Sequence, residues 1–321
     1  MKFTIVGIGE VLWDIYGSEK YLGGAPANFA FHAHQLGNEG IIVSKIGKDE
    51  LGNEIIRSLK EKGLNTNFIQ LDRNYPTGTV YVKLLPNSIP KFLCSKNVAF
   101  DYIEFDENLE SLSETTDAVL FGTLAQRNEF SRKTITDFIK SLKKAIVVYD
   151  ANFRGFKKKQ IKIVENSLSL SNILKVNDIE FKKLKIAFDK EKMEHLKFLN
   201  QLVNEFDLDL ICITFGRWGC LFYNKYETIY SPGVKINPID TVGSGDAFIA
   251  SLITKYLQKR PLKEISEFSN YVGAFVATKK GATPIYNNND INNFIHTNTK
   301  RNIKKKLGNT LLNNLYLFTV I

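Results

Sequence analysis

The chain has 321 residues, of which 44% are hydrophobic and 24% charged, as is typical of a soluble globular protein with one large domain or two modest ones. A net charge of +9 would suit nucleic-acid binding, but residues 297–321 hold five basic residues and no acid, so the excess is largely a property of that tail. We therefore expect a solvated tail, no nucleic-acid partner and no membrane span, because no apolar run approaches the roughly 20 residues that a bilayer requires.

In chain order, the first predicted elements are a strand at 3–6, a helix at 26–37, a strand at 41–46 and a helix at 49–62. From residue 118 onward, strands are predicted at 118–121, 145–149, 173–176 and 210–214, and helices at 128–143, 159–170 and 178–206 lie between them. Pro26 suits a first helical turn, and Gly63 suits the end of a helix. The strands are apolar on both faces, which is expected when helices cover both sides of a parallel sheet. The alternation predicts an α/β fold with three layers and a mostly parallel central sheet.

Residues 66–105 interrupt this alternation. They hold β-rich runs at 79–85, 92–94 and 98–105, with turns predicted at Pro86, Asn87 and Pro90. Together with residues 10–20, this segment predicts a small β-rich lid beside the α/β body. The alternative is an edge extension of the main sheet. We expect one domain over 1–296 and a basic, then apolar, tail of unassigned role over 297–321.

The three cysteines, Cys94, Cys212 and Cys220, lack the paired spacing of a zinc site or a disulfide framework. Such cysteine usage is typical of a reducing compartment, so a cytoplasmic location is expected. The start of the chain is too short and polar for a signal peptide.

The strongest motif is residues 240–248, Asp-Thr-Val-Gly-Ser-Gly-Asp-Ala-Phe. Gly243, Ser244 and Gly245 open an apolar helix, where backbone N–H groups without intrahelical partners and the helix dipole favour an anion. An ionised carboxylate in the same turn, that of Asp246, would not help to bind an anion but could accept a proton. The stretch therefore predicts a phosphoryl-transfer site with its own base. The common phosphate loop and the full dinucleotide fingerprint are absent from the sequence.

This stretch resembles the C-terminal signature of the ribokinase-like (phosphofructokinase-B type) sugar kinases, with Ser244 in place of the usual alanine. The resemblance extends over about residues 1–290. It implies a ribokinase-like fold and ATP- and Mg²⁺-dependent phosphorylation of a sugar hydroxyl. Asp246 would be the base, and the amides of Gly243 to Asp246 would stabilise the transferred phosphoryl group.

On the sugar side, Gly23, Gly24 and Asn28 match the family's Gly-Gly-x-x-x-Asn, and Asp14 matches an early aspartate that binds sugar hydroxyls. Plain turn and helix-start chemistry is the alternative explanation of the glycines. Gln126 and Arg127 follow a strand and are expected to point at the sugar. With residues 76–78, they resemble fructokinase-like members. Fructose or a related ketose or sugar acid is therefore expected, with ribose, 2-keto-3-deoxygluconate and a nucleoside as alternatives.

On the nucleotide side, Asn177 and Glu180 match an Asn-x-x-Glu motif that acts on Mg²⁺ and its waters, and a helix N-cap is the alternative. Asp150 to Arg154 resembles the family's Asp-Pro-Asn-x-Arg, which implies that Arg154 faces phosphate oxygens. The resemblance implies nucleotide contacts at Asn177, Thr214, Gly216, Gly219, Gly245 and Asn270. It also makes Asp240, Val242 and Gly281 candidate ligands of a monovalent cation such as K⁺.

Two further expectations concern partners and activity. The lid strands often pair in this family, which implies a homodimer. A non-catalytic sugar-sensing protein on the same fold is the alternative to an active kinase.

Overall fold

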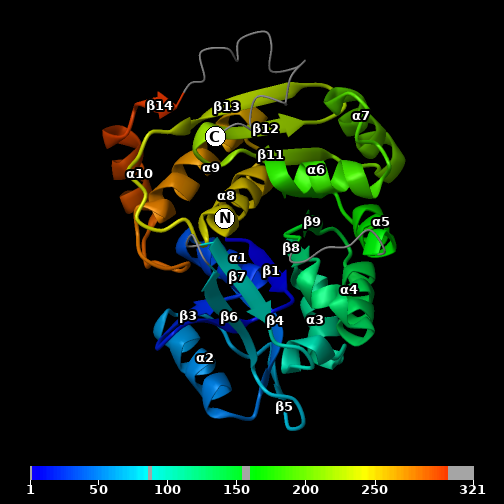
Figure 1. Cartoon of the computed structure of the whole chain (residues 1–321), viewed down its shortest axis with the longest axis vertical. Helices are drawn as coiled ribbons and strands as arrows, with labels where there is room; N and C mark the ends of the chain where they lie inside the picture. The colour runs from blue at the N-terminus through cyan, green and yellow to red at the C-terminus, as the bar shows by residue number, and fades with distance from the viewer. Residues whose placement is uncertain (1, 86–88, 154–159, 303–321) are drawn as a thin grey trace.

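The computed structural model of the chain describes residues 2–85, 89–153 and 160–302, and within them a ten-stranded sheet forms the centre of the body (Figure 1). Its order is β14-β13-β12-β11-β10-β9-β8-β1-β4-β5. The strands from β11 to β5 run parallel, and β12, β13 and β14 extend the sheet in antiparallel fashion. The bounds are β1 Thr4–Ile8, β4 Glu39–Gly47, β5 Ile69–Asp72, β8 Ala118–Gly122, β9 Ile146–Asp150, β10 Ile173–Asn177, β11 Leu210–Thr214, β12 Gly219–Tyr223, β13 Thr228–Val234 and β14 Arg301–Asn302.

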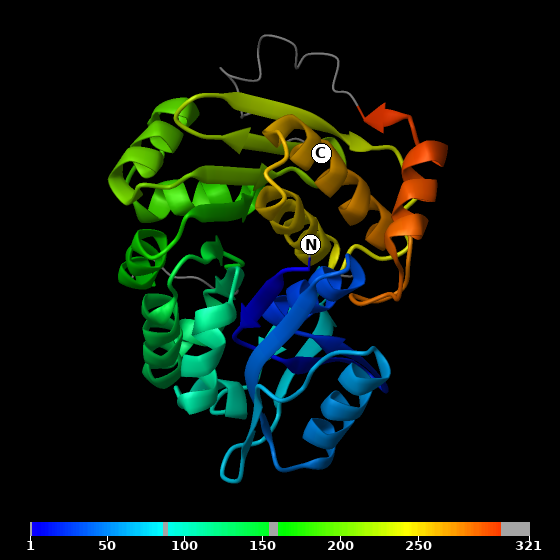
Figure 2. The ribbon, with the colours of Figure 1, turned by 180° about the vertical axis from the view of Figure 1, so that it is seen from behind.

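Helices cover both faces of this sheet (Figures 1 and 2). Along β8, Val119 and Phe121 face a core shared with α3 to α7, whereas Ala118 and Leu120 face a core shared with α1, α8, α9 and α10. The helix bounds are α1 Ala25–Gln35, α2 Glu50–Glu61, α3 Glu107–Thr115, α4 Glu129–Ser141, α5 Ile161–Ser169, α6 Asp178–Ala187, α7 His195–Phe206, α8 Ser244–Leu257, α9 Leu262–Ala277 and α10 Asn288–Thr297. The predicted three-layer α/β/α architecture is confirmed.

One predicted helix is wrong in its extent. Residues 178–206 form two helices, α6 and α7, rather than one. Asp189 has a φ of 56°, a left-handed conformation that does not continue a right-handed helix. No glycine or proline marks this break in the sequence.

A second sheet of four strands, in the order β3-β2-β6-β7, lies beside the body. Its strands are β2 Leu12–Tyr16, β3 Glu19–Gly23, β6 Gly78–Leu85 and β7 Ile89–Cys94. The pair β2 and β6 is parallel, and the two outer pairs are antiparallel. A small β-rich unit is therefore present, as predicted, and we call these four strands the lid sheet.

Three details of the lid prediction are corrected. Pro90 lies inside β7, opposite Leu84, rather than in a turn, and β7 is an edge strand, where proline is tolerated. Residues 98–105 form no strand, because a 3₁₀ turn at Ala99–Tyr102 buries Phe100. Strand β5 pairs with β4, so the segment 66–105 also extends the edge of the main sheet.

Parts of the predictions fall outside the described residues, namely the turn at Pro86 and Asn87, Arg154, and the tail from residue 303 onward. Within the described ranges, no helix is long and apolar enough to cross a membrane.

Candidate active site

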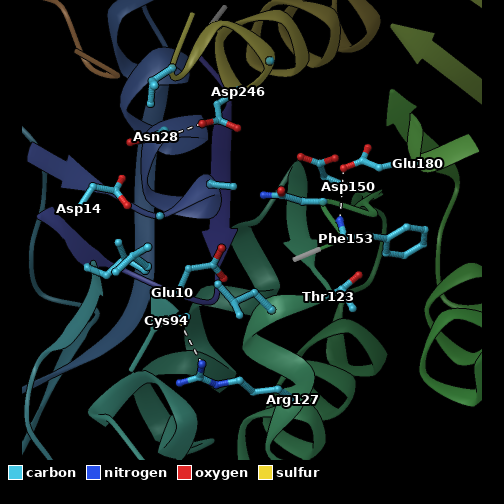
Figure 3. A pocket seen from close by; sticks show the side chains of 18 of the residues that line it. Glu10, Asp14, Asn28, Cys94, Thr123, Arg127, Asp150, Phe153, Glu180 and Asp246 are labelled. Carbon is cyan, nitrogen blue, oxygen red and sulfur yellow. Dashed lines mark hydrogen bonds between the residues drawn. The ribbon is translucent and has the colours of Figure 1, made fainter. Parts of the chain in front are cut away.

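A cavity of about 1360 Å³ lies between the lid sheet, the carboxyl ends of the parallel strands and the start of α8 (Figure 3). This edge is where open α/β sheets bind ligands. Asp14 reaches the cavity from the lid sheet, Asn28 from α1 and Asp246 from α8, while Asp150 and Glu180 lie on the opposite wall. Segments far apart in the sequence therefore supply one polar site.

Helix α8 begins at a tight approach to another loop. Gly243 has a φ of 77°, and a Cβ added there would lie 2.3 Å from the carbonyl oxygen of Ala282. Glycine is therefore required at this position both by its conformation and by the space available. Gly243, Gly245 and Asp246 line the cavity, so the first turn of the helix, with its favourable dipole for anions, faces the site.

Asp246 is held by α1, the helix that begins directly after the Gly-Gly pair. The side-chain amide of Asn28 donates a hydrogen bond of 2.9 Å from Nδ2 to Oδ2 of Asp246. Asn28 is 4% exposed and lines the cavity, and its Oδ1 accepts no hydrogen bond from the described residues. The predicted sugar-side residue and the predicted base are thus adjacent.

A buried histidine ties the same helix to the loop beside Gly243. Nδ1 of His32 lies 3.0 Å from the hydroxyl of Tyr286, and Nε2 lies 2.9 Å from the carbonyl oxygen of Ala282. Burial lowers the pKa of His32 to about 3, so its imidazole is neutral. A neutral ring that accepts from Tyr286 and donates to Ala282 satisfies both contacts.

The Gly-Gly pair makes room for the lid and the start of α1. A Cβ added at Gly23 would lie 2.3 Å from Oδ2 of Asp14 on the neighbouring strand. One added at Gly24, where φ is 109°, would lie 2.3 Å from the carbonyl oxygen of Glu10. Gly23 therefore sets the position of a carboxylate, whereas Gly24 sets the path of the backbone.

The structure places a lysine in the site that the sequence reasoning missed. Lys175 and Asp150 are direct neighbours on β10 and β9, and Nζ of Lys175 donates to Oδ1 of Asp150 at 3.2 Å. Both side chains are more than nine-tenths buried. The signal available was a lysine within the otherwise apolar run Ile-Leu-Lys-Val that ends at the ligand edge of the sheet.

The pKa values of Asp150 and Lys175 are shifted by burial and by neighbouring charges. Burial raises the pKa of Asp150 to about 7; the carboxylates of Glu180 and Asp246 act in the same direction, and Lys175 opposes them. Burial alone would lower the pKa of Lys175, but the carboxylates of Asp150, Glu180 and Asp246 raise it above its usual value. Lys175 is thus a fixed cation in the cavity wall.

Asn177 and Glu180 form a helix cap and also line the cavity. Oδ1 of Asn177 accepts from the amide of Glu180, and Oε2 of Glu180 accepts from the amide of Asn177, both at 2.8 Å. Oε1 of Glu180 accepts from the amide of Phe153 at 3.2 Å (Figure 3). Among the described residues, no group of three or more His, Cys, Asp or Glu side chains could hold a metal ion. These hard oxygens nevertheless fit Mg²⁺ that keeps most of its waters.

Of the two residues expected at the sugar, one lies elsewhere. Gln126 is 3% exposed, and its Nε2 donates to the carbonyl of Gly122 and to the hydroxyl of Ser167, so its side chain is turned toward α5 rather than into the cavity. Arg127 lines the cavity but is bound by the two carboxylate oxygens of Asp101.

Arg127 also attaches the lid sheet to the body. It donates to Sγ of Cys94 at 3.0 Å and to the carbonyl of Ser95 at 2.6 Å, at the end of β7 (Figure 3). Most of its donors are therefore used inside the protein.

Four of the predicted nucleotide contacts lie at the carboxyl end of β11, in the turn that follows it and on α9. Thr214 ends β11, and Gly216 and Gly219 form the turn to β12, outside the lining of the cavity. A Cβ at Gly219 would lie 2.0 Å from the carbonyl oxygen of Ser231, so this glycine is required for packing. Asn270 donates from Nδ2 to the same carbonyl at 3.0 Å.

The three candidate cation ligands lie together. Oδ1 of Asp240 accepts from the amide of Val242, and Oδ2 accepts from the amide of Gly281, both at 3.0 Å. The carboxylate thus joins the loop before α8 to the loop after α9.

The chain is similar to known proteins in sequence and in overall structure. A model of the pfkB family of carbohydrate kinases matches residues 14–289. The chain is 31% identical over 297 residues to a putative sugar kinase of Pyrococcus horikoshii, covering 87% of this chain and 91% of that protein. Fructokinase-2 of Solanum lycopersicum is 29% identical over 311 residues, with 87% and 92% covered. A crystal structure of an uncharacterized sugar kinase of Pyrococcus horikoshii in complex with ATP matches with a TM-score of 0.77 and 28% identity, over 90% of this chain and 99% of that one.

Proposed function

This chain belongs to the pfkB family of carbohydrate kinases, and we propose that it transfers the γ-phosphoryl group of ATP to a hydroxyl of fructose or of a closely related ketose or sugar acid. The observation that carries this proposal is the contact between Asn28 and Asp246 at the start of α8. This contact supports a shared site for the proposed sugar-side group, the proposed base and the first turn of the helix. The fructokinases among the relatives support fructose as the first candidate.

In the proposed reaction, Asp246 accepts the proton of the attacking hydroxyl. Its carboxylate accepts a hydrogen bond from that hydroxyl as the loose transition state develops. Asn28 holds the carboxylate in place. We expect the amides of Gly243, Gly245 and Asp246 to stabilise the phosphoryl oxygens, while the amide of Ser244 donates to the carbonyl of Thr241 at 3.3 Å.

In this proposal the nucleotide extends from the part of the cavity lined by α6 to the turn after β11, which lies outside the lining of the cavity. Asn177 and Glu180 would hold the waters of Mg²⁺, and the ion, when bound, neutralises charge on the phosphates. Thr214, Gly216 and Gly219 would contact the nucleotide, and Asn270 would lie on its adenine side. Arg154, outside the described residues, is proposed from its motif to contact phosphate oxygens. A K⁺ ion beside Asp240, Val242 and Gly281 would fix the loops that flank the first turn of α8.

The sugar lies between the lid sheet and α1. Asp14 accepts hydrogen bonds from its hydroxyls, and the buried Oδ1 of Asn28 is an acceptor for another. We propose residues 1–296 as one kinase domain whose lid sheet excludes water from the reacting groups. The exposed Tyr81 and Leu93, opposite each other on β6 and β7, support pairing of two lid sheets in a homodimer.

The test is a kinase assay with fructose, ribose, 2-keto-3-deoxygluconate and adenosine as acceptors, in the presence of Mg²⁺ and K⁺. We expect phosphorylated fructose, or a phosphorylated sugar acid, and near-complete loss of product in an Asp246→Asn variant of unchanged fold. An Asp246→Asn variant with a near-native rate would refute the assigned base. Thermal stabilisation by a sugar without any phosphorylated product would instead indicate a sugar-sensing protein.

A further inference from the structure

We propose that Lys175 is a further catalytic residue, whose ammonium group contacts the transferred phosphoryl group from the sheet side while the first turn of α8 contacts it from the other side. This inference rests on the proposed kinase function and adds a group that none of the sequence motifs contains.

The position of Lys175 follows from the pleat of β10. Ile173, two residues earlier, packs in the core beneath α8 and α9, so Lys175 projects from the same face of the sheet, toward the start of α8. A Cβ added at Gly245 would lie 3.5 Å from Nζ of Lys175, and this is the nearest atom that such a Cβ would meet. The glycine in the first turn of the helix therefore leaves the ammonium group beside the predicted phosphoryl position.

The hydrogen bonds of Lys175 leave room for a ligand. An ammonium group has three donors, and the described residues supply one acceptor, Oδ1 of Asp150 at 3.2 Å. The lysine side chain is nonetheless only 9% exposed and lines the cavity. A buried cation with unused donors, aimed at a helix N-terminus, is suited to an oxyanion placed between the two.

The surroundings of Lys175 keep a buried cation beside the start of α8. A buried cation loses its hydration, and the positive end of the dipole of α8 repels it. Asp150, Glu180 and Asp246 keep it charged. An anionic phosphoryl group between Lys175 and the helix would be attracted by both positive partners at once, which gives this arrangement a purpose that a structural ion pair lacks.

Other cationic side chains of the cavity are less well placed for this role. Arg127 is bound by Asp101, and Arg132 donates to the carbonyl of Gln126, on the side of the cavity formed by α4. Lys96 is exposed at the lid.

Lys175 donates no proton in the chemical step. The bond between the γ-phosphorus and the oxygen that bridges it to the β-phosphate breaks, and ADP leaves with the electron pair. A new bond forms between the phosphorus and the sugar oxygen, whose proton passes to Asp246. Lys175 remains protonated throughout and stabilises charge on the phosphoryl oxygens and on the leaving oxygen.

The experiment compares four enzymes, the wild type, Lys175→Met, Asp150→Asn and the double variant, each as the full chain. Wild-type turnover of the sugar is measured first, since its absence would refute the proposed function rather than the role of Lys175. For Lys175→Met we expect kcat to fall about 100- to 1,000-fold, as for removal of one oxyanion donor. The dissociation constants for the sugar and for MgADP should change less than about threefold. Aluminium fluoride mimics the transferring phosphoryl group, so the dissociation constant for MgADP with aluminium fluoride should rise by the same factor by which kcat falls.

The double variant separates catalysis from ion pairing. If Lys175 only neutralises Asp150, then removing the carboxylate as well should restore activity along with thermal stability. We expect the double variant to regain thermal stability and to keep the kcat of Lys175→Met within about tenfold. Recovery of wild-type kcat in the double variant, or equal loss of affinity for MgADP with and without aluminium fluoride, would overturn the inference. If Lys175→Met alone fails to fold, the double variant still provides both measurements.

Discussion

Gly23→Ala should impair sugar binding without unfolding the protein, because the added methyl group meets one flexible side chain. The new Cβ would lie 2.3 Å from Oδ2 of Asp14, whereas ordinary contacts begin near 3.4 Å, so the carboxylate must move by about 1 Å. Its other close neighbour, Cδ1 of Leu12 at 3.2 Å, needs only a small adjustment. The backbone at Gly23 is not in the left-handed region, so the substitution adds no conformational strain.

The size of the effect follows from the hydrogen bond that is disturbed. A hydrogen bond to a charged group contributes about 1.5–3 kcal/mol, and each 1.4 kcal/mol is about tenfold, so losing one contact of Asp14 with the sugar should lower kcat/KM about 10- to 150-fold. The loss should come mainly from a higher KM for the sugar. The KM for ATP should stay within about twofold, because Asp14 lies on the lid side of the cavity.

The assay is steady-state kinetics with each substrate varied in turn, together with the Tm of each variant. Gly24→Ala is the matched control, since its Cβ would meet the backbone carbonyl of Glu10 at a φ of 109° and should lower Tm instead. If Gly23 acts through Asp14, then Gly23→Ala should add little to the defect of Asp14→Ala. An unchanged kcat/KM for Gly23→Ala, or additive losses in the double variant, would refute the reasoning.

Three further predictions concern stability, the lid and assembly. Because the pKa of His32 is about 3 in the native state and about 6.5 in the unfolded chain, protonation of the unfolded state should destabilise the protein as pH falls below about 6.5. The difference in unfolding free energy between the wild type and His32→Asn, from urea titrations, should therefore shrink from pH 8 to pH 5, and a constant difference would contradict the assignment. Arg127→Met should loosen the lid sheet and raise ATP hydrolysis relative to sugar phosphorylation. The control is Lys133→Met, which removes an exposed ion pair and should leave this ratio unchanged. Equal ratios of ADP to sugar phosphate in both variants would count against a lid attachment. Tyr81→Glu with Leu93→Glu should yield monomers by sedimentation velocity, and a surviving dimer would place the interface elsewhere.

The sequence was sufficient for the fold because its local signals agree with one another. Apolar runs at the predicted strands are buried on both faces, and the parallel order follows from helices between them. The break between α6 and α7 was missed because Asp189 adopts a left-handed conformation that glycine or asparagine more often marks. The 3₁₀ turn around Phe100 was missed because tertiary burial of one aromatic side chain overrides a β-like composition.

For the site, the motifs predicted residues around the cavity but not the direction of every side chain. Gln126 turns away because Ser167, 41 residues later, offers it a buried partner, and no local pattern contains that information. For Lys175, the lysine in an apolar strand was a local signal, but its neighbours Asp150 and Gly245 are remote in the chain and meet it only after the sheet and α8 assemble.

The cap that Asn177 and Glu180 form has a consequence for interpreting related sequences. Because the two side chains begin α6 through reciprocal hydrogen bonds, a protein that lost catalysis would still be under selection to keep both of them for folding. Their presence in a paralogue is therefore weak evidence of activity. Lys175 differs, because a protein that has also lost the carboxylate of Asp150 gains no stability from retaining the lysine. We therefore expect loss of Lys175 together with Asp246 to be a better indicator of an inactive descendant than loss of the Asn-x-x-Glu motif.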